Sequence, residues 1–405
     1  MTLADCTVMV VEDHEFQRRT TLQILANLGA GTLLEAADGE RALLLLGGDP
    51  RPDIVVCDLD MPGMDGVEFL RQVSELGAGT AIVIASGLDD SVVRSAEATA
   101  RAYGLEVLGA IRKPLTARLL LAAVGLHRPA SAPPPEPAVE PGDDPWIAAL
   151  REDRVGVRIR PRVELASGRL GAVEARGHRV EPAVAADFGG SSGAVVVDAA
   201  TDPLGPTAGS VAISVADRIA RAGLAAQRLL GEAGELVDVA LVLPPGALSD
   251  PAVVERLAGL AAEAGVELAR VCVALPDARG ASPAAAPLDV LTRLRVRGFG
   301  LGIDGFGTAR ATLQELRQLP LTEVKTAADA LGRATASLRG AEAFSATVQS
   351  LADQGLDVVC DGCDSQAEWE LALQAGARRA QGAFVGPALA HQDMASWSLL
   401  WGGVL

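Results

Sequence analysis

Length, composition and charge limit what this chain can be. Its 405 residues are enough for two or three domains, and a hydrophobic content of 49% is enough for large buried cores. The net charge of −17 and the aromatic content of 3% disfavour nucleic-acid binding, because an acidic surface repels phosphates and few rings are present to stack on bases. The N-terminus has no signal-peptide pattern, and no apolar run reaches the roughly 20 residues that span a bilayer. We therefore expect a cytoplasmic protein that binds no DNA and inserts into no membrane.

Residues 1–127 alternate short apolar runs with amphipathic stretches. Helical periodicity is visible in Gln17–Leu28 and Gly66–Leu76. The apolar runs are rich in Val and Ile, which is typical of buried strands: Val8–Val11, Ile54–Cys57, Ala81–Ala85 and Val107–Ile111. This alternation predicts an α/β domain with a doubly wound parallel sheet and helices on both faces.

Polar residues stand at the ends of these four expected strands. They are Glu12 with Asp13, Asp58, Ser86, and Lys113 before Pro114. Taken singly, an aspartate after a strand is more often a turn or a helix cap, and a Lys-Pro pair is more often a plain loop. The four features together favour one pocket, because ligands of open parallel sheets bind at the carboxyl ends of the strands.

The residue types in this pocket suit phosphoryl transfer to a carboxylate. Asp58 is the expected nucleophile. Glu12, Asp13 and Asp58 offer the oxygen ligands that Mg²⁺ prefers. Lys113 would neutralise the phosphoryl oxygens and Ser86 would donate a hydrogen bond to them.

Residues 5–125 resemble the receiver domain of two-component response regulators. The resemblance rests on the stretches VVEDHE, VVCDLDMPGMDGVEF, VIASG and IRKP. It implies a flavodoxin-like fold, phosphorylation on Asp58 and a cognate histidine kinase as partner. One departure is Ala110, where the family commonly has an aromatic residue that moves inward on phosphorylation, so the usual aromatic switch is in question.

A linker is expected at residues 128–146 because this stretch is dense in proline, alanine and acid. The third segment, residues 147–405, again alternates strands and helices. Its expected strands are Gly156–Pro161, Leu170–Ala175, Ala194–Val197, Val237–Leu243, Arg270–Leu275, Gly300–Ile303, Glu323–Lys325, Asp357–Cys360 and Gly382–Val385. About eight strand–helix units in a block of this length predict a closed TIM-like (β/α)8 barrel.

The third segment resembles the EAL family of cyclic di-GMP phosphodiesterases over about residues 150–395. The matching stretches are GRLGAVEARGHR, IDGFGTARATLQELRQLPLTEVK and QGAFVGP. Active members hydrolyse cyclic di-GMP to pGpG with two Mg²⁺ or Mn²⁺ ions. The resemblance carries six site residues over to this chain: Glu174, Asp304, Lys325, Asp361, Asp364 and Gln381.

Other family positions have lost their function. The ligand Asn falls at Val242, a ligand Glu falls at Ala274 with Asp277 nearby, and the second Asp of a pair is Gly305. The glutamine before the early proline is Arg160, and an arginine that contacts the nucleotide falls near His178. Because two dications repel each other and need several anionic ligands, we expect no stable Mg²⁺ or Mn²⁺ pair in this barrel.

Two functions remain open at this stage. The first is a response regulator whose catalytically inactive EAL-like domain acts through an unknown protein partner or as a cyclic di-GMP sensor. The second is a weak or divergent cyclic di-GMP phosphodiesterase under receiver control. Family analogy also suggests a homodimer, and the sequence names neither the kinase nor the partner.

Overall fold

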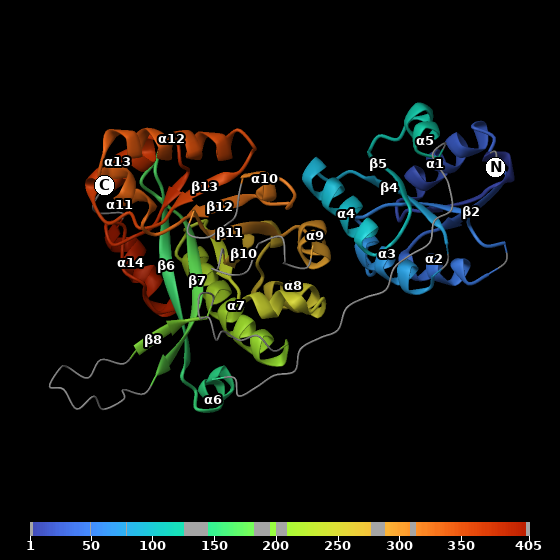
Figure 1. The fold of residues 1–405 in the computed structure, drawn as a ribbon. Helices are drawn as coiled ribbons and strands as arrows, with labels where there is room; N and C mark the ends of the chain where they lie inside the picture. The colour runs from blue at the N-terminus through green and yellow to red at the C-terminus, as the bar shows by residue number, and fades with distance from the viewer. Residues whose placement is uncertain are drawn as a thin grey trace. The chain divides into compact units, whose positions relative to one another are not determined.

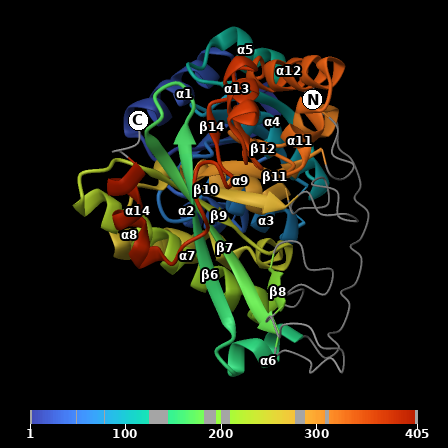
Figure 2. The same cartoon turned by 90° about the vertical axis from the view of Figure 1, so that its left-hand side faces the viewer.

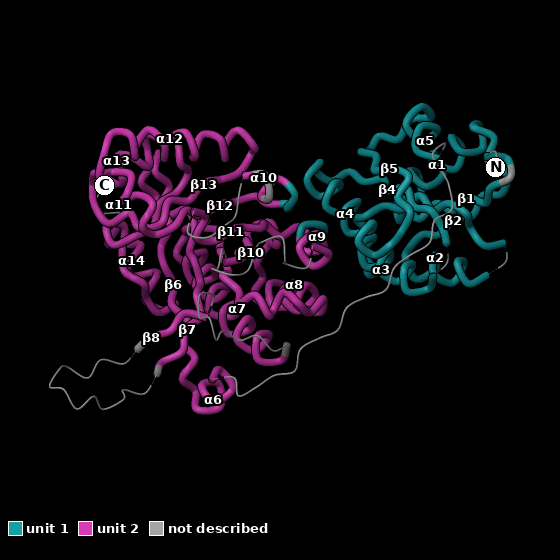
Figure 3. The backbone as a smooth tube through the Cα atoms, viewed as in Figure 1, with its two compact units in different colours: residues 1–138, 295–297, 318–320 teal, residues 139–294, 298–317, 321–405 magenta. Residues whose placement is uncertain are grey.

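The computed structural model forms two compact units, one built mainly from residues 1–138 and the other mainly from residues 139–405 (Figure 3). The structure describes residues 3–48, 50–77, 79–124, 145–181, 195–199, 209–276, 288–307 and 313–401. Most of the expected linker lies outside the described residues. Its last two residues, Pro145 and Trp146, begin a helix, and Trp146 is fully buried. Domain bounds of 1–127, 128–146 and 147–405 stay predictions.

The first unit is a parallel sheet in the order β2-β1-β3-β4-β5. Figure 1 shows the sheet together with its helices α1 to α5. Its strands are β1 (Thr7–Val11), β2 (Thr32–Ala36), β3 (Ile54–Cys57), β4 (Ala81–Ser86) and β5 (Val107–Arg112). Its helices are α1 (Glu15–Asn27), α2 (Gly39–Leu46), α3 (Gly66–Glu75), α4 (Asp90–Ala102) and α5 (Ala117–Val124). Every residue of β3 and β4 is buried, as expected for strands covered on both faces. The winding order reverses between β1 and β3, which opens a crevice at their carboxyl ends.

The second unit is a closed barrel of eight strands, and the long pair β6 and β7 is prominent in Figure 2. The barrel strands are β6 (Val155–Glu164), β7 (Leu170–Glu181), β9 (Asp238–Val242), β10 (Val271–Pro276), β11 (Gly300–Phe306), β12 (Glu323–Thr326), β13 (Asp357–Cys360) and β14 (Arg379–Ala380). β6 runs antiparallel to both of its neighbours, and the other barrel strands are parallel. A further strand, β8 (Val195–Asp198), pairs with β7 outside the barrel.

Helices surround this barrel. They are α6 (Pro145–Arg151), α7 (Gly209–Glu232), α8 (Ala252–Ala264), α9 (Leu288–Val296), α10 (Leu313–Leu316), α11 (Ala330–Thr335), α12 (Leu338–Ala352), α13 (Gln366–Gln374) and α14 (Met394–Trp401). No helix among the described residues is both long enough and apolar enough to cross a membrane.

Both expected fold classes are confirmed, with two differences of detail in the barrel. The expected strand Gly382–Val385 is wrong: these residues form a turn, and the strand is Arg379–Ala380. Gly382, whose φ is 155°, lies too close to the backbone of Cys363 for a side chain, so a turn with tight backbone packing occupies this position. The first barrel strand is antiparallel because β6 and β7 are joined as a hairpin rather than through a helix.

Candidate functional sites

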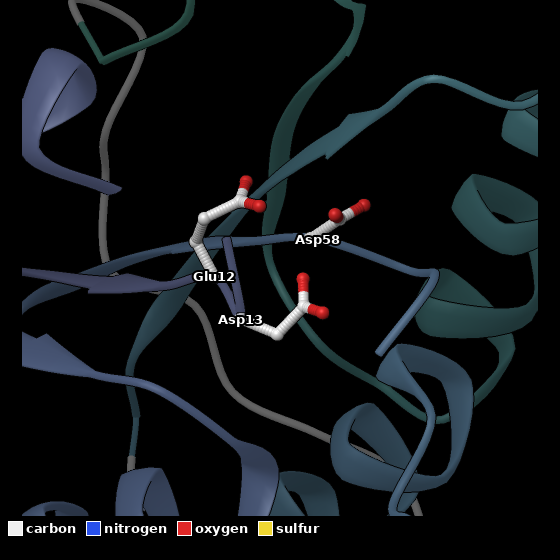
Figure 4. Close-up of side chains that lie close together, drawn as sticks. All are labelled: Glu12, Asp13 and Asp58. Carbon is white, nitrogen blue, oxygen red and sulfur yellow. The ribbon is translucent and has the colours of Figure 1, made fainter. Parts of the chain in front are cut away.

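The carboxyl ends of β1 and β3 bring three acidic side chains together in the receiver unit. Glu12 and Asp13 follow β1, and Asp58 follows the neighbouring β3. One carboxylate oxygen from each of these residues lies within 4.8 Å of the others, close enough to hold one metal ion (Figure 4). Among the described residues, this is the one group of three or more potential ligands gathered so closely.

Asp58 is fixed by the turn that follows it. Its Oδ1 accepts hydrogen bonds from the backbone N–H of Leu59 at 2.7 Å and of Asp60 at 3.3 Å. The turn then passes Gly66, where a Cβ atom would lie 2.2 Å from the carbonyl oxygen of Asp58. A glycine is therefore needed for α3 to begin directly beside the backbone of Asp58.

Lys113 reaches the acidic group from the end of β5. Its Nζ lies 2.6 Å from Oε2 of Glu12 and 2.7 Å from Oδ2 of Asp58. Burial raises the pKa of Glu12 in spite of the hydrogen bond from Lys113, and the charge of Asp58 adds to this rise. Burial alone would lower the pKa of Lys113, but its bonds to Asp58 and Glu12 raise it. Negative charge is thus in excess around a single lysine.

Ser86 and Ala110 lie on the two neighbouring strands β4 and β5. Ser86 ends β4, is fully buried, and accepts a hydrogen bond at Oγ from the N–H of Leu88. Its carbonyl oxygen accepts from the N–H of Lys113 at 2.9 Å, which ties the two strand ends together. Ala110 packs against the apolar core with a methyl group alone.

The barrel interior holds a second set of carboxylates, and a lysine joins them. Lys325 on β12 is buried, with Nζ 2.5 Å from Oε2 of Glu174 on β7 and 2.6 Å from Oδ1 of Asp304 on β11. Oδ2 of Asp361, after β13, lies 3.7 Å from the same Nζ. Three of the six residues carried over from the resemblance thus meet around the ammonium group of a fourth, Lys325.

Gln381 and Asp364 complete that set in different ways. Gln381 is buried and donates from Nε2 to Glu174 at 3.2 Å and to Asp361 at 3.1 Å. Asp364 is exposed, and its Oδ1 accepts from the N–H of Ala383 at 2.6 Å. Asp364 therefore fixes a turn and is not among the side chains that meet around Lys325.

Two arginines that the sequence reasoning did not assign to the interior also lie among these carboxylates. Arg162 on β6 is 1% exposed and lies 2.5 Å from Glu174 Oε2 and 2.6 Å from Glu323 Oε1. Arg176 on β7 lies 2.6 Å from Asp304 Oδ2 and 2.8 Å from Asp198 Oδ2. For Arg162, the signal in the sequence was the alternation of Arg158, Arg160 and Arg162 along β6, because residues two apart share a face.

The cations around these carboxylates set their protonation. Burial alone would raise the pKa of Glu174, but Lys325, Arg162 and Arg176 hold it well below its usual value. Burial likewise opposes ionisation of Asp304, and Arg176 and Lys325 lower its pKa. Both carboxylates are therefore anions that already have cationic partners.

The positions at which the resemblance places the missing metal ligands are apolar or lack a side chain. Val242 on β9 and Ala274 on β10 are paired in register and form a small buried apolar cluster. Gly305 has a φ of 89°, in the left-handed region that favours glycine, and it offers no side-chain oxygen. Asp277 lies outside the described residues. Within the part of the barrel that the structure describes, the residues thus do not fit a pair of divalent ions, whereas the acidic group of the receiver fits one.

Comparison with known proteins identifies both units. The EAL domain family matches residues 147–388, and the response regulator receiver domain family matches residues 8–125. The cyclic di-GMP phosphodiesterase RocR of Pseudomonas aeruginosa is 27% identical over 389 residues, which cover 93% of this chain and 95% of RocR.

Solved structures agree on the barrel fold. A complex of the PaMucR phosphodiesterase with c-di-GMP covers 61% of this chain and 97% of its own, at 19% identity and a TM-score of 0.50. The cAMP-bound form of the EAL enzyme Bd1971 covers 62% of this chain and 67% of its own, at 16% identity and a TM-score of 0.52. At these identities the likeness concerns the fold alone.

Proposed function

Because the chain belongs to the EAL domain family and also carries a response regulator receiver domain, we propose that it is a response regulator of cyclic di-GMP signalling whose barrel no longer hydrolyses the nucleotide. One observation carries the second half of this proposal. The carboxylates Glu174 and Asp304 are bound by Lys325 and Arg176 instead of facing a vacant metal position.

The proposed phosphorylation of the receiver rests on its acidic pocket. Asp58 attacks the phosphorus of a phosphohistidine on the kinase, an O–P bond forms, and the P–N bond to the histidine breaks. Glu12, Asp13 and Asp58 would hold Mg²⁺, which supplies positive charge to the transferring phosphoryl group. Lys113 then moves from its ion pair with Asp58 to the phosphoryl oxygens, and Ser86 donates a hydrogen bond to them.

The proposed loss of hydrolysis in the barrel follows from the charges of its interior and from the small number of metal ligands there. Hydrolysis in this family needs a metal-activated water, and a dication in a buried site needs uncompensated anionic ligands. Val242, Ala274 and Gly305 supply no side-chain oxygen, and Glu174 and Asp304 are already neutralised. The barrel therefore acts by binding, and we favour a protein partner over the nucleotide as its ligand.

A second candidate is a weak cyclic di-GMP phosphodiesterase, and one finding favours it. The chain aligns with RocR over nearly its full length, and RocR is a cyclic di-GMP phosphodiesterase. Glu174, Asp304, Lys325 and Asp361 also remain gathered in the interior. In this reading phosphorylation of Asp58 would rearrange the interior into a metal site.

Calorimetry on the full chain distinguishes between a barrel that binds a protein partner, one that senses cyclic di-GMP and one that hydrolyses it. Cyclic di-GMP is titrated into protein that holds Mg²⁺ and beryllofluoride, a mimic of the phosphoryl group. Absence of binding heat is the expected result and directs the search to a protein partner of the phosphorylated form. Binding heat without pGpG would make the barrel a sensor, and binding heat with pGpG would overturn the proposal.

Light scattering on the same sample tests the expected homodimer, and cell fractionation tests the expected cytoplasmic location.

A further inference from the structure

We propose that Arg176 is a resident cation that occupies the place of a divalent ion in the barrel and so keeps metal out. The inference rests on the proposed loss of hydrolysis and names the residue responsible. It also predicts a gain of metal binding when that residue is removed, which loss of ligands alone does not predict.

The contacts of Arg176 are those of a bridging cation. Its Nη1 lies 2.6 Å from Asp304 Oδ2 and 3.6 Å from Glu174 Oε1, and its Nε lies 2.8 Å from Asp198 Oδ2. The side chain is 14% exposed, so it is largely removed from water. One guanidinium thus joins carboxylates from β7, β8 and β11, much as an ion bridges ligands from several strands.

Strand geometry explains why the side chain of Arg176 reaches these carboxylates. Residues two apart on a strand face the same side, so Arg176 shares the inward face with Glu174. In the register between β7 and β9, Arg176 lies directly beside Val242. The cation therefore stands next to the position where a metal ligand has been replaced by an apolar side chain.

The charges of the interior balance without a metal ion. Arg160, Arg162, Arg176 and Lys325 contact four carboxylates at 3.9 Å or less, those of Glu174, Asp198, Asp304 and Asp361. Glu323, which Arg162 also contacts, has Arg379 as a further cationic partner. A dication added to this set would leave two uncompensated positive charges in a site largely shielded from water, which is strongly unfavourable. Removal of Arg176 leaves one negative charge in excess and frees Oδ2 of Asp304.

The experiment measures Mn²⁺ binding to the full chain by electron paramagnetic resonance. All variants carry Asp13→Ala so that the receiver pocket contributes little. Barrels with Arg176 should bind no Mn²⁺ at micromolar concentrations. Arg176→Leu, and Arg176→Gln as a second variant that keeps a hydrogen-bond donor, should each bind one ion with an affinity at least tenfold above the upper limit set for the Asp13→Ala parent.

Two matched controls sharpen the result. Arg176→Lys keeps the charge and should continue to exclude Mn²⁺. Arg158→Leu removes an exposed arginine that faces Arg176 across the β6–β7 pair, and it should not create a site. A gain in Arg158→Leu equal to that in Arg176→Leu would show a general charge effect and overturn the specific role of Arg176.

The outcomes separate this inference from the proposed function. Tight Mn²⁺ binding by the barrel with Arg176 present would overturn the inference, while the proposed function would survive as long as no pGpG forms. No gain of binding in folded Arg176→Leu and Arg176→Gln, judged by circular dichroism, would make Arg176 a plain ion-pair partner. That result would overturn the inference and leave the proposed function intact.

Discussion

The receiver pocket and the barrel interior both collect carboxylates around one lysine, yet their electrostatics are opposite. In the receiver, Lys113 contacts Glu12 and Asp58, Asp13 lies close to both, and the pKa of Glu12 is raised by burial and by the charge of Asp58. In the barrel, the pKa values of Glu174 and Asp304 are lowered by surrounding cations. A cluster of acids is therefore a metal site when its negative charge is in excess, and an ion-pair network when arginines balance it.

The largest expected effect is on phosphorylation of the receiver. Asp58→Asn removes the nucleophilic carboxylate and should abolish labelling by a phosphoryl donor. Asp60→Asn is the matched control, because its side chain is exposed and only its backbone N–H contacts Asp58. Intact-protein mass spectrometry after incubation with acetyl phosphate and Mg²⁺ measures the added phosphoryl group. A phosphorylated Asp58→Asn variant would show that the acceptor is another residue.

The next effect concerns stability of the barrel. Lys325→Met leaves Glu174 and Asp304 with fewer cations, and loss of one partner from a buried ion network costs about 3–5 kcal/mol. Arg218→Met is the control, because its ion pair with Asp153 is exposed and is worth at most about 1 kcal/mol. Urea unfolding followed by tryptophan fluorescence reports the barrel, since Trp146, Trp369, Trp397 and Trp401 all lie in it. Equal decreases in the free energy of unfolding of the two variants would contradict a stabilising role of the buried ion-pair network.

Acid pH should change the stability of the two units in opposite directions. Lowered pKa values of Glu174 and Asp304 mean that the folded barrel binds fewer protons than the unfolded chain. Their contribution to stability is present above their usual pKa values of 4.5 and 3.8 and is lost as the pH falls below them. The raised pKa values of Glu12 and Asp60 have the opposite sign, so these two receiver residues favour folding at acid pH.

Hydrogen exchange at pH 5 and below measures this difference on the full chain. Amides of the barrel strands β7, β11 and β12 should lose protection at a higher pH than those of β1 and β3. Earlier loss of protection in the receiver strands would contradict the assignment of the two charge patterns.

The smallest effect is expected at Ser86. Ser86→Ala removes one hydrogen bond to the phosphoryl group, and a hydrogen bond to a charged group is worth about 1.5–3 kcal/mol. The phosphorylated fraction at equilibrium with acetyl phosphate should fall by about tenfold or more. Ser86→Thr keeps the hydroxyl and should retain most of the modification. An unchanged fraction in Ser86→Ala would mean that Ser86 does not contact the phosphoryl group.

Sequence reasoning reached the receiver site and missed part of the barrel interior for a physical reason. Asp58 and Lys113 stand directly after apolar runs, so strand ends located by local pattern also locate the pocket. The pair Arg162 and Glu323 is separated by 161 residues, and only closure of the barrel brings the two together. Gly382–Val385 was wrong as a strand because the tight approach of Gly382 to Cys363 is a tertiary contact.

The central claim is that the receiver accepts a phosphoryl group while the barrel does not hydrolyse cyclic di-GMP. The most direct test incubates the full chain, with and without beryllofluoride, with cyclic di-GMP and either Mg²⁺ or Mn²⁺, and then quantifies pGpG by chromatography. We predict that no pGpG forms above the level of a Glu174→Ala variant in any of these conditions. Formation of pGpG that beryllofluoride increases and Glu174→Ala abolishes would contradict the claim and make the protein a regulated phosphodiesterase.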